Sequence, residues 1–244
     1  MKILITGATS GIGRQVAIDY HKLGHEVWAV GRNAQALEEL SSLGLRTGQV
    51  DLTDSAATLA WFSTLDSIDL AILNAGTCEY VDMPRFDSAL VIRVMRANVE
   101  SLAICLEGVL PLLRKSNAAH LAVVGSSAAY VPLPRAEAYG SSKAAVAYMV
   151  ETLRIALAKE KITVSLICPG FVKTPLVEKQ IPEQAKELNM SEEDVIKKIM
   201  LKDTVDGEFT SLKDLADCAV FLAGFDGLAL TGQSFIVSHG WYME

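Results

Sequence analysis

Two side chains with complementary chemistry stand four residues apart in the stretch AYGSSKAAV, which runs from Ala138 to Val146. They are a phenol, Tyr139, and an ammonium group, Lys143. If the stretch is helical, both side chains leave the same face one turn apart. The pair is then either a reactive site or part of a solvated helix face, because such a spacing arises by chance about once in a few hundred positions. The elements around the pair must decide between these interpretations.

The composition describes a globular chain with an acidic balance. Of its 244 residues, 50% are hydrophobic and 21% are charged, and the net charge is −7. No basic stripe is present to displace counterions from phosphates, so we expect no nucleic-acid partner. The apolar part of KILITGATSGIG, which follows Met1, is far shorter than a membrane span, and no small-residue cleavage site follows it. We therefore expect neither a signal peptide nor a transmembrane helix, and no membrane partner.

The cysteines are widely separated along the sequence. They are Cys78, Cys105, Cys168 and Cys218, with no CxxC pair and no histidine at a ligand spacing. This pattern favours buried free thiols in a reducing cytoplasm over disulfides, and it predicts no metal site.

Short apolar runs alternate with longer amphipathic runs along the chain. The expected strands are KILIT, EVWAVG, LRTGQV, IDLAILN, HLAVVGS, ITVSLIC and a final QSFIVS. Helices are expected at Ile12–Leu23, Ala34–Ser41, Ser55–Ser63, Phe86–Leu113, Tyr139–Glu160 and Leu212–Ala223. Continuous Val/Ile/Leu runs are typical of strands buried on both faces. The alternation predicts a single α/β domain, residues 1–244, with a doubly wound parallel sheet of about seven strands and helices on both faces, a Rossmann-type fold.

A charged helical segment, residues 175–209, interrupts the alternation between the last two expected strands. Ser191 and Asp194 resemble a helix-start capping pattern. The segment is either a pair of surface helices or a small lid over the ligand-binding edge of the sheet. We favour the lid, because insertions of this length in compact domains usually have a function.

Glycines gather in TGATSGIG, residues 6–13, between the first strand and the first helix. Gly7, Gly11 and Gly13 permit a tight turn and a close approach of backbone to a pyrophosphate, which would then lie at the positive end of the helix. The spacing differs from the usual dinucleotide Gly-x-Gly-x-x-Gly, and an ordinary glycine-rich turn is the alternative. The position between strand and helix favours a dinucleotide site.

The second strand ends in VGRN, where an NAD-selective site places an acidic residue for the ribose 2′-OH. Here Gly31 is followed by Arg32, whose guanidinium matches a 2′-phosphate, so we expect a preference for NADP(H), with NAD(H) still possible. A solvated surface arginine is the alternative. After the third strand, Asp51 is placed to meet the adenine, and the NAG motif of residues 74–76 would flank the adenosine half.

In this order, TGATSGIG, NAG, YGSSK and PGFVKTP resemble the short-chain dehydrogenase/reductase superfamily over essentially the whole chain. The resemblance implies a hydride transfer between a nicotinamide cofactor and a small carbonyl or alcohol. It also implies that the catalytic residues are Asn98, Ser126, Tyr139 and Lys143, with neighbouring Ser127 the less favoured serine. The residues expected to contact the dinucleotide are Gly7, Thr9, Ser10, Gly11, Ile12, Gly13, Arg32, Asp51, Leu52, Asn74, Ala75, Gly76, Tyr139, Lys143, Pro169, Gly170, Val172 and Thr174.

The chemistry assigns each catalytic residue a role. Tyr139 would donate a proton to the oxygen that gains charge as hydride arrives, and Lys143 should lower the pKa of that phenol. Ser126 would stabilise the developing oxygen charge. The resemblance adds that Lys143 binds the nicotinamide ribose and that Asn98 fixes a water molecule in a proton relay. A polar residue that bends a helix is the alternative for Asn98.

The two parts of the chain resemble different subgroups where the substrate should bind. Beyond Thr174 the sequence is similar to bacterial 3-hydroxybutyrate dehydrogenases, whose lid Gln and C-terminal Trp match Gln180 and Trp241. The first part is more like other bacterial reductases, because Cys78, Ala128 and Ala136 replace the hydroxybutyrate enzymes' Gln, His and Lys.

We therefore expect a generic carbonyl reductase or alcohol dehydrogenase, with NAD-dependent 3-hydroxybutyrate oxidation as the alternative. Cys78 would form a small apolar wall, and Arg135 is expected in solvent. A non-catalytic dinucleotide sensor is a minor alternative, because the Ser, Tyr and Lys are all present. The resemblance also implies a homodimer or homotetramer, although the same helix faces could simply pack on their own sheet.

Overall fold

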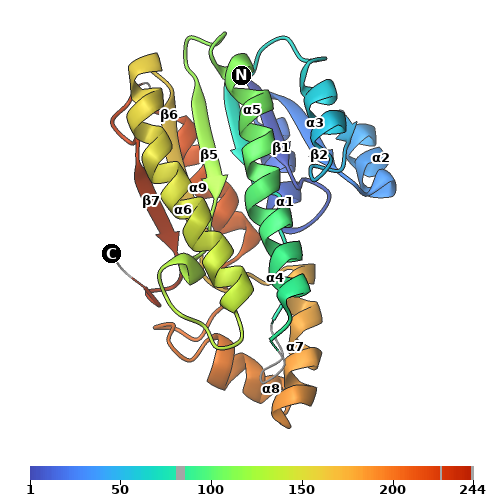
Figure 1. Cartoon of the computed structure of the whole chain (residues 1–244), viewed down its shortest axis with the longest axis vertical. Helices are drawn as coiled ribbons and strands as arrows, with labels where there is room; N and C mark the ends of the chain where they lie inside the picture. The colour runs from blue at the N-terminus through green and yellow to red at the C-terminus, as the bar shows by residue number, and fades with distance from the viewer. Residues whose placement is uncertain (81–85, 226, 243–244) are drawn as a thin grey trace.

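The computed structural model describes residues 1–80, 86–225 and 227–242. In that part of the chain, seven strands form one parallel sheet in the order β3-β2-β1-β4-β5-β6-β7 (Figure 1). The strands are β1 (Lys2–Thr6), β2 (Glu26–Gly31), β3 (Arg46–Gln49), β4 (Leu70–Leu73), β5 (His120–Val124), β6 (Thr163–Pro169) and β7 (Gln233–Val237). This order confirms the doubly wound sheet. Its direction of winding reverses between β1 and β4, where ligands bind in such folds.

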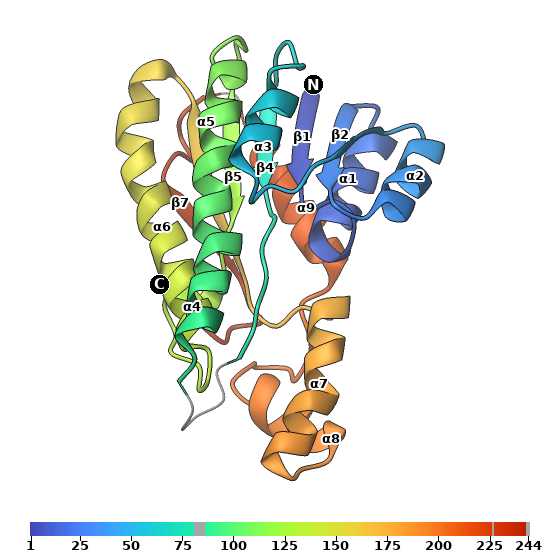
Figure 2. The ribbon, with the colours of Figure 1, turned by 45° about the vertical axis from the view of Figure 1, so that its right-hand side comes forward.

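Helices cover both faces of the sheet (Figure 2). One face carries α1 (Gly11–Lys22), α2 (Ala34–Ser42) and α9 (Leu212–Ala223), and the other carries α3 (Ser55–Phe62), α5 (Ser101–Leu113) and α6 (Glu137–Leu157). Strands β4, β5 and β6 are buried at every position, as their continuous apolar sequences predict. Each face therefore has its own apolar core, and the sheet separates the two.

The helix expected over residues 86–113 is interrupted. Helix α4 spans Ser88–Met95 and begins at Asp87, whose side chain accepts a hydrogen bond from the Ala89 amide. A π-helical turn follows at residues 96–100, and α5 begins at Ser101. Such a turn inserts one extra residue into the helix and is common at functional sites. The turn contains Asn98, one of the expected catalytic residues.

The segment expected as a lid forms helices at the carboxyl edge of the sheet (Figure 2). Helix α7 spans Pro175–Leu188, α8 spans Glu192–Val195, and a π-helical turn follows at residues 196–200. The expected helix start is confirmed, since the Ser191 hydroxyl accepts a 3.1 Å hydrogen bond from the Asp194 amide. These helices pack around a small apolar cluster of their own, which includes Ile181, Val195 and Met200. The segment thus has a separate core beside the sheet.

None of the helices in the described ranges is long and apolar enough to cross a membrane. Among the same residues, no group of three or more His, Cys, Asp or Glu side chains is placed to hold a metal ion.

Candidate active site

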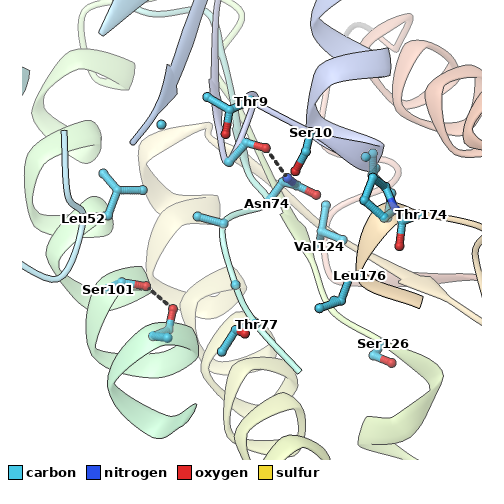
Figure 3. A pocket seen from close by; sticks show the side chains of 18 of the residues that line it. Thr9, Ser10, Leu52, Asn74, Thr77, Ser101, Val124, Ser126, Thr174 and Leu176 are labelled. Atoms are coloured by element: carbon cyan, nitrogen blue, oxygen red, sulfur yellow. Dashed lines mark hydrogen bonds between the residues drawn. The ribbon is translucent and has the colours of Figure 1, made fainter. Parts of the chain in front are cut away.

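A cleft with a volume of about 720 Å³ lies along the carboxyl edge of the sheet (Figure 3). Its lining comes from the segments that follow β1, β2, β3, β4, β5 and β6, together with α6 and the start of α7. Of the residues expected to contact a dinucleotide, the cleft is lined by Gly7, Thr9, Ser10, Gly11, Ile12, Arg32, Asp51, Leu52, Asn74, Ala75, Gly76, Tyr139, Lys143, Pro169, Gly170, Val172 and Thr174. Residues between positions 7 and 177 are thus gathered at one site.

Gly13 is the expected contact that lies outside the lining. It packs beneath the glycine turn, where a Cβ atom would lie 2.5 Å from both Asn74 Nδ2 and the Gly7 oxygen. Asn74 in turn donates hydrogen bonds to the carbonyl oxygens of Thr6 and Gly7, at 3.1 and 3.3 Å. A glycine is therefore required at position 13, because the glycine turn and the end of β4 pack against it. Gly13 thus helps to shape the cleft without lining it.

The end of β2 opens into the cleft beside the glycine turn. A Cβ atom on Gly31 would lie 2.6 Å from Thr9 Cγ2, so this position cannot carry an acidic side chain unless the Thr9 side chain shifts. Arg32 is exposed and lines the cleft, and Gln49 Nε2 donates a 3.3 Å hydrogen bond to its carbonyl oxygen. The cleft therefore presents a cation, rather than a carboxylate, at the end of this strand.

Asp51 lies further along the same side of the cleft. Hydrogen bonds from the amide and hydroxyl of Thr53 lower the pKa of its carboxyl group, and the nearby Arg32 and Arg96 lower it further. The carboxylate is therefore ionised and held in a fixed position, facing the exposed part of the cleft.

Tyr139 lies in the cleft wall, one helical turn from Lys143 on α6. Burial raises the pKa of the Tyr139 phenol, the nearby Cys78 raises it further, and a hydrogen bond from Ser126 opposes this effect. Ser126 also lines the cleft, and its Oγ accepts a 3.1 Å hydrogen bond from the Ala128 amide. The structure thus joins Ser126 to Tyr139, whereas Ser127 is buried outside the lining.

The expected lowering of the Tyr139 pKa by Lys143 is not found. The Lys143 ammonium lies 5.9 Å from the centre of the Tyr139 ring and donates a 2.9 Å hydrogen bond to the Val124 carbonyl oxygen. Burial lowers the pKa of Lys143 itself to about 8. The prediction considered only the attraction between the two groups. In the structure, the cost of burying a charged form is larger for both.

Asn98 connects the π-helical turn to its surroundings through its side-chain amide. Nδ2 donates 2.9 Å hydrogen bonds to the Thr77 oxygen and to Ser142 Oγ, and Oδ1 accepts a 2.7 Å bond from the Thr77 amide. It does not line the large cleft. Asn98 and Lys143 instead line a cavity of about 10 Å³ behind it, near the minimum size for one water molecule.

The residues expected to contact substrate lie just beyond the cleft. Gln180, on α7, is buried, and its Nε2 lies 3.5 Å from the carbonyl oxygen of Cys78. Burial raises the pKa of the Cys78 thiol to about 11, so it stays protonated. Trp241 stacks on Phe171 with ring centres 5.5 Å apart. Ala128 is buried behind Ser126.

Three residues that sequence reasoning missed or misplaced surround this substrate side. Arg135, expected in solvent, forms an ion pair with Glu187 of α7, and its side chain is 22% exposed. Tyr80 and Gln184 were not identified. The spacing of Gln184 from Gln180, four residues along a helix, was the available signal. The pairings themselves join positions far apart in the sequence.

Comparisons with known proteins place the chain among oxidoreductases. The family model for short chain dehydrogenase matches residues 1–185. The chain is 30% identical to a D-beta-hydroxybutyrate dehydrogenase from Rhizobium meliloti, an alignment covering 98% of this chain and 97% of that protein. It resembles the Pseudomonas aeruginosa RhlG/NADP active-site complex at 26% identity, with a TM-score of 0.85 and 99% and 96% of the two chains covered.

A further similarity concerns the fold alone. A crystal structure of an actinorhodin polyketide ketoreductase with NADPH is 23% identical, with a TM-score of 0.90 over 98% of this chain and 96% of that one. The observed sheet order and the cleft at its carboxyl edge agree with these similarities.

Proposed function

The chain belongs to the short-chain dehydrogenase family, and from this premise we propose that it is an NADP-dependent reductase of small ketones, with Tyr139 as its proton donor. Membership makes it an oxidoreductase of the NAD(P)-dependent class that acts on CH–OH groups. The preference for NADP, the residue roles and the substrate are our proposal.

The placement of Ser126 and Tyr139 in one wall of the cleft, close enough for Ser126 to oppose the rise in the phenol's pKa, is the observation that carries the proposal. It brings two hydroxyl groups to one point of the cleft wall, where a carbonyl oxygen could accept a hydrogen bond from each. The bound dinucleotide would supply the hydride. As charge develops on the substrate oxygen, Ser126 stabilises it and Tyr139 transfers its proton. The raised pKa of Tyr139 keeps that proton in place at neutral pH.

We propose that Lys143 supplies Tyr139 with a replacement proton, which is taken up from solvent, and that Asn98 positions this relay. Lys143 has a pKa near 8, so it can release and regain a proton close to neutral pH. The cavity of about 10 Å³ between Lys143 and Asn98 could hold one water molecule of the relay. The three hydrogen bonds of Asn98 to Thr77 and Ser142 fix the position of its side chain beside that cavity.

The residues at the end of β2 support the preference for NADP(H). The glycine turn, the start of α1 and the exposed Arg32 form a continuous lining that fits a dinucleotide with a 2′-phosphate. Arg32 offers a planar set of donors to that phosphate, and the close contact of Gly31 with Thr9 keeps an acidic side chain away. The proposed preference for NADP over NAD rests on these residues.

We also propose that the chain acts as one domain, with residues 175–209 as a lid over bound substrate. Helix α7 begins at Thr174 in the cleft wall and reaches Cys78 through Gln180. Movement of α7 would open and close the substrate side.

NAD-dependent 3-hydroxybutyrate oxidation is the second candidate. Gln180 faces the loop after β4, and Trp241 stacks beside Gly170, at the positions implied for a small hydroxy acid. The similarity to the Rhizobium meliloti protein adds to this candidate.

Two further expectations remain proposals. Tyr148 and Ile155 on α6 are 70% and 61% exposed, which supports pairing of this helix with a second copy in a dimer or tetramer. None of Cys78, Cys105, Cys168 and Cys218 forms a disulfide within the described residues, which supports a reducing, cytoplasmic location.

Initial rates measured at 340 nm test the proposed function. The purified protein is given small ketones with NADPH or NADH, and in parallel 3-hydroxybutyrate with NAD⁺ or NADP⁺. We expect turnover of neutral ketones with NADPH to exceed every other combination. Faster oxidation of 3-hydroxybutyrate with NAD⁺ would favour the second candidate, and no turnover under any condition would contradict both.

A further inference from the structure

A row of polar side chains on the lid helix faces the loop after β4. Gln180 and Gln184 are one turn apart on α7 and only 5% and 7% exposed, and Glu187 follows one turn later. The neighbours Ile181 and Ala185 pack into the apolar cluster of the lid. Two glutamines buried on one face of a charged helix are unusual, because buried amides require hydrogen-bonding partners.

The residues close to these glutamines also lie near the Tyr139 phenol. Burial raises the pKa of the Tyr80 phenol, the nearby Cys78 raises it further, and Gln184, which lies close to the phenol, opposes this rise. Both Cys78 and Tyr80 lie close enough to Tyr139 to affect its titration. Cys78, Tyr80 and Gln184 therefore form a polar path that lies near Tyr139 at one end and on the lid helix at the other.

The cation near this path is already paired. The Arg135 guanidinium lies over the Tyr80 ring, 5.9 Å from its centre, and forms an ion pair with Glu187. Arg135 adopts a φ of 67°, a backbone conformation that few non-glycine residues hold without compensation from their surroundings. Glu79, the acidic residue between Cys78 and Tyr80, is paired with Arg93 through bonds of 2.7–3.2 Å. The charged side chains named on the substrate side are thus paired, each with one of opposite sign.

We propose that Gln184 and Tyr80 bind a second, uncharged hydrogen-bonding group of the substrate, and that Glu187 excludes carboxylates by holding Arg135. This inference rests on the proposed function and names its substrate class: ketones that carry a carboxamide, hydroxyl or similar neutral polar group beyond the reacting carbonyl.

The chemistry of the path favours a neutral group over an anion. A glutamine amide supplies both a donor and an acceptor, and a phenol can act as either, so together they match a carboxamide or hydroxyl. A carboxylate in the same place would lose its hydration and find the nearby guanidinium neutralised by Glu187. Discrimination between the two arises from the unmatched charge, since the shapes of a carboxamide and a carboxylate are nearly the same.

Three ketones of similar size separate these possibilities. Acetoacetamide carries a neutral polar group, acetoacetate carries a charge in its place, and 2-pentanone carries neither. We expect kcat/KM with NADPH to be about tenfold higher for acetoacetamide than for acetoacetate, as for one well-placed hydrogen bond. Glu187→Gln removes the carboxylate that neutralises Arg135, so it should raise the ratio of acetoacetate to acetoacetamide about tenfold.

A matched control lies on the same helix. Glu183→Gln removes the same charge from an exposed position, where Glu183 pairs with Lys179, and should leave the substrate ratios unchanged. Gln184→Met removes the amide at similar volume and should lower the ratio of acetoacetamide to 2-pentanone about tenfold. Thermal unfolding of each variant checks that the fold is retained.

The outcomes distinguish failure of the substrate-class inference from failure of the proposed function. Reduction of 2-pentanone with ratios that do not respond to Glu187→Gln and Gln184→Met would overturn the substrate-class inference and leave the proposed function standing. A wild-type preference for acetoacetate would also overturn the inference and favour the hydroxybutyrate candidate. Absence of turnover with all three ketones would overturn the proposed function, and the inference with it.

Discussion

Asn98 Nδ2 donates a 2.9 Å hydrogen bond to Ser142 Oγ, which joins the π-helical turn at residues 96–100 to the helix that carries Tyr139 and Lys143. Ser142 is fully buried and donates its own hydroxyl proton to the Tyr139 carbonyl oxygen at 2.7 Å. The other bonds of Asn98 hold Thr77, directly after the NAG motif. One amide therefore connects the loop after β4 with helix α6.

This connection predicts graded losses of stability. Ser142→Ala removes one acceptor and should lower the free energy of unfolding by about 1 kcal/mol, whereas Asn98→Leu removes three bonds and should cost about 3 kcal/mol. Because Thr77 borders the cleft, Asn98→Leu should also weaken NADPH binding. Urea unfolding and cofactor titration measure both effects. Ser141→Ala, at an exposed neighbouring position, is the control, and equal losses for Ser141→Ala and Ser142→Ala would contradict the assignment.

Tyr139→Phe tests the proton donor directly. The substitution keeps the ring and removes the hydroxyl group, so kcat for ketone reduction should fall by about 10²–10⁴-fold while the Kd for NADPH changes little. Stopped-assay product analysis and fluorescence titration measure the two quantities. Tyr148→Phe, an exposed tyrosine on the same helix, is the matched control. Retention of kcat in Tyr139→Phe would remove the residue from the reaction.

The raised pKa of Tyr139 predicts a different pH dependence for each direction of the reaction. Alcohol oxidation needs the phenolate as a base, which is scarce below the raised pKa, so kcat/KM for oxidation should rise up to about tenfold per pH unit between pH 7 and 9. Reduction needs the protonated phenol, which is already the dominant form, and should not show this rise. A flat oxidation profile over this range would indicate that another group accepts the proton.

Arg32→Ala tests the proposed cofactor preference. Loss of a charge-assisted contact to the 2′-phosphate should raise the Kd for NADPH about 10–100-fold, and the Kd for NADH should hardly change. Isothermal titration of the two cofactors measures the difference. Arg46→Ala on β3 is a suitable control, because Arg46 is exposed and pairs with Glu26, away from the cleft lining. Equal weakening of both cofactors by Arg32→Ala would show that the arginine acts only on the shape of the site.

The sequence predicted the sheet, and which residues gather in the cleft around the glycine turn, because both depend on local patterns. Buried parallel strands require continuous apolar runs, and a turn such as Gly7–Gly13 requires glycines at fixed positions. The π-helical turn was not predictable, since its Asn98–Ser142 bond spans 44 residues.

The substrate side was predicted poorly for a related reason. The pairing of Arg135 with Glu187 spans 52 residues and depends on where the lid helix docks. The pKa of Tyr139 depends on burial beside Cys78, which the four-residue spacing to Lys143 does not reveal. Sequence spacing identifies which groups can meet along one helix, but the extent of their burial follows from the packing of distant segments.

The burial of His120 leads us to expect that the free energy of unfolding falls in acid. It lies at the start of β5, is 6% exposed, and has its Nε2 atom 3.2 Å from Ser165 Oγ. Burial lowers its pKa to about 4, so as the pH falls, the unfolded chain binds a proton at His120 near pH 6.5 and the folded chain does so only near pH 4. The stability contributed by neutral His120 is therefore complete above about pH 6.5 and should fall by about 2 kcal/mol between pH 7 and 5. His120→Gln should remove this part of the pH dependence in urea unfolding, while His21→Gln retains it; identical slopes for wild type and His120→Gln would assign the acid sensitivity to other groups.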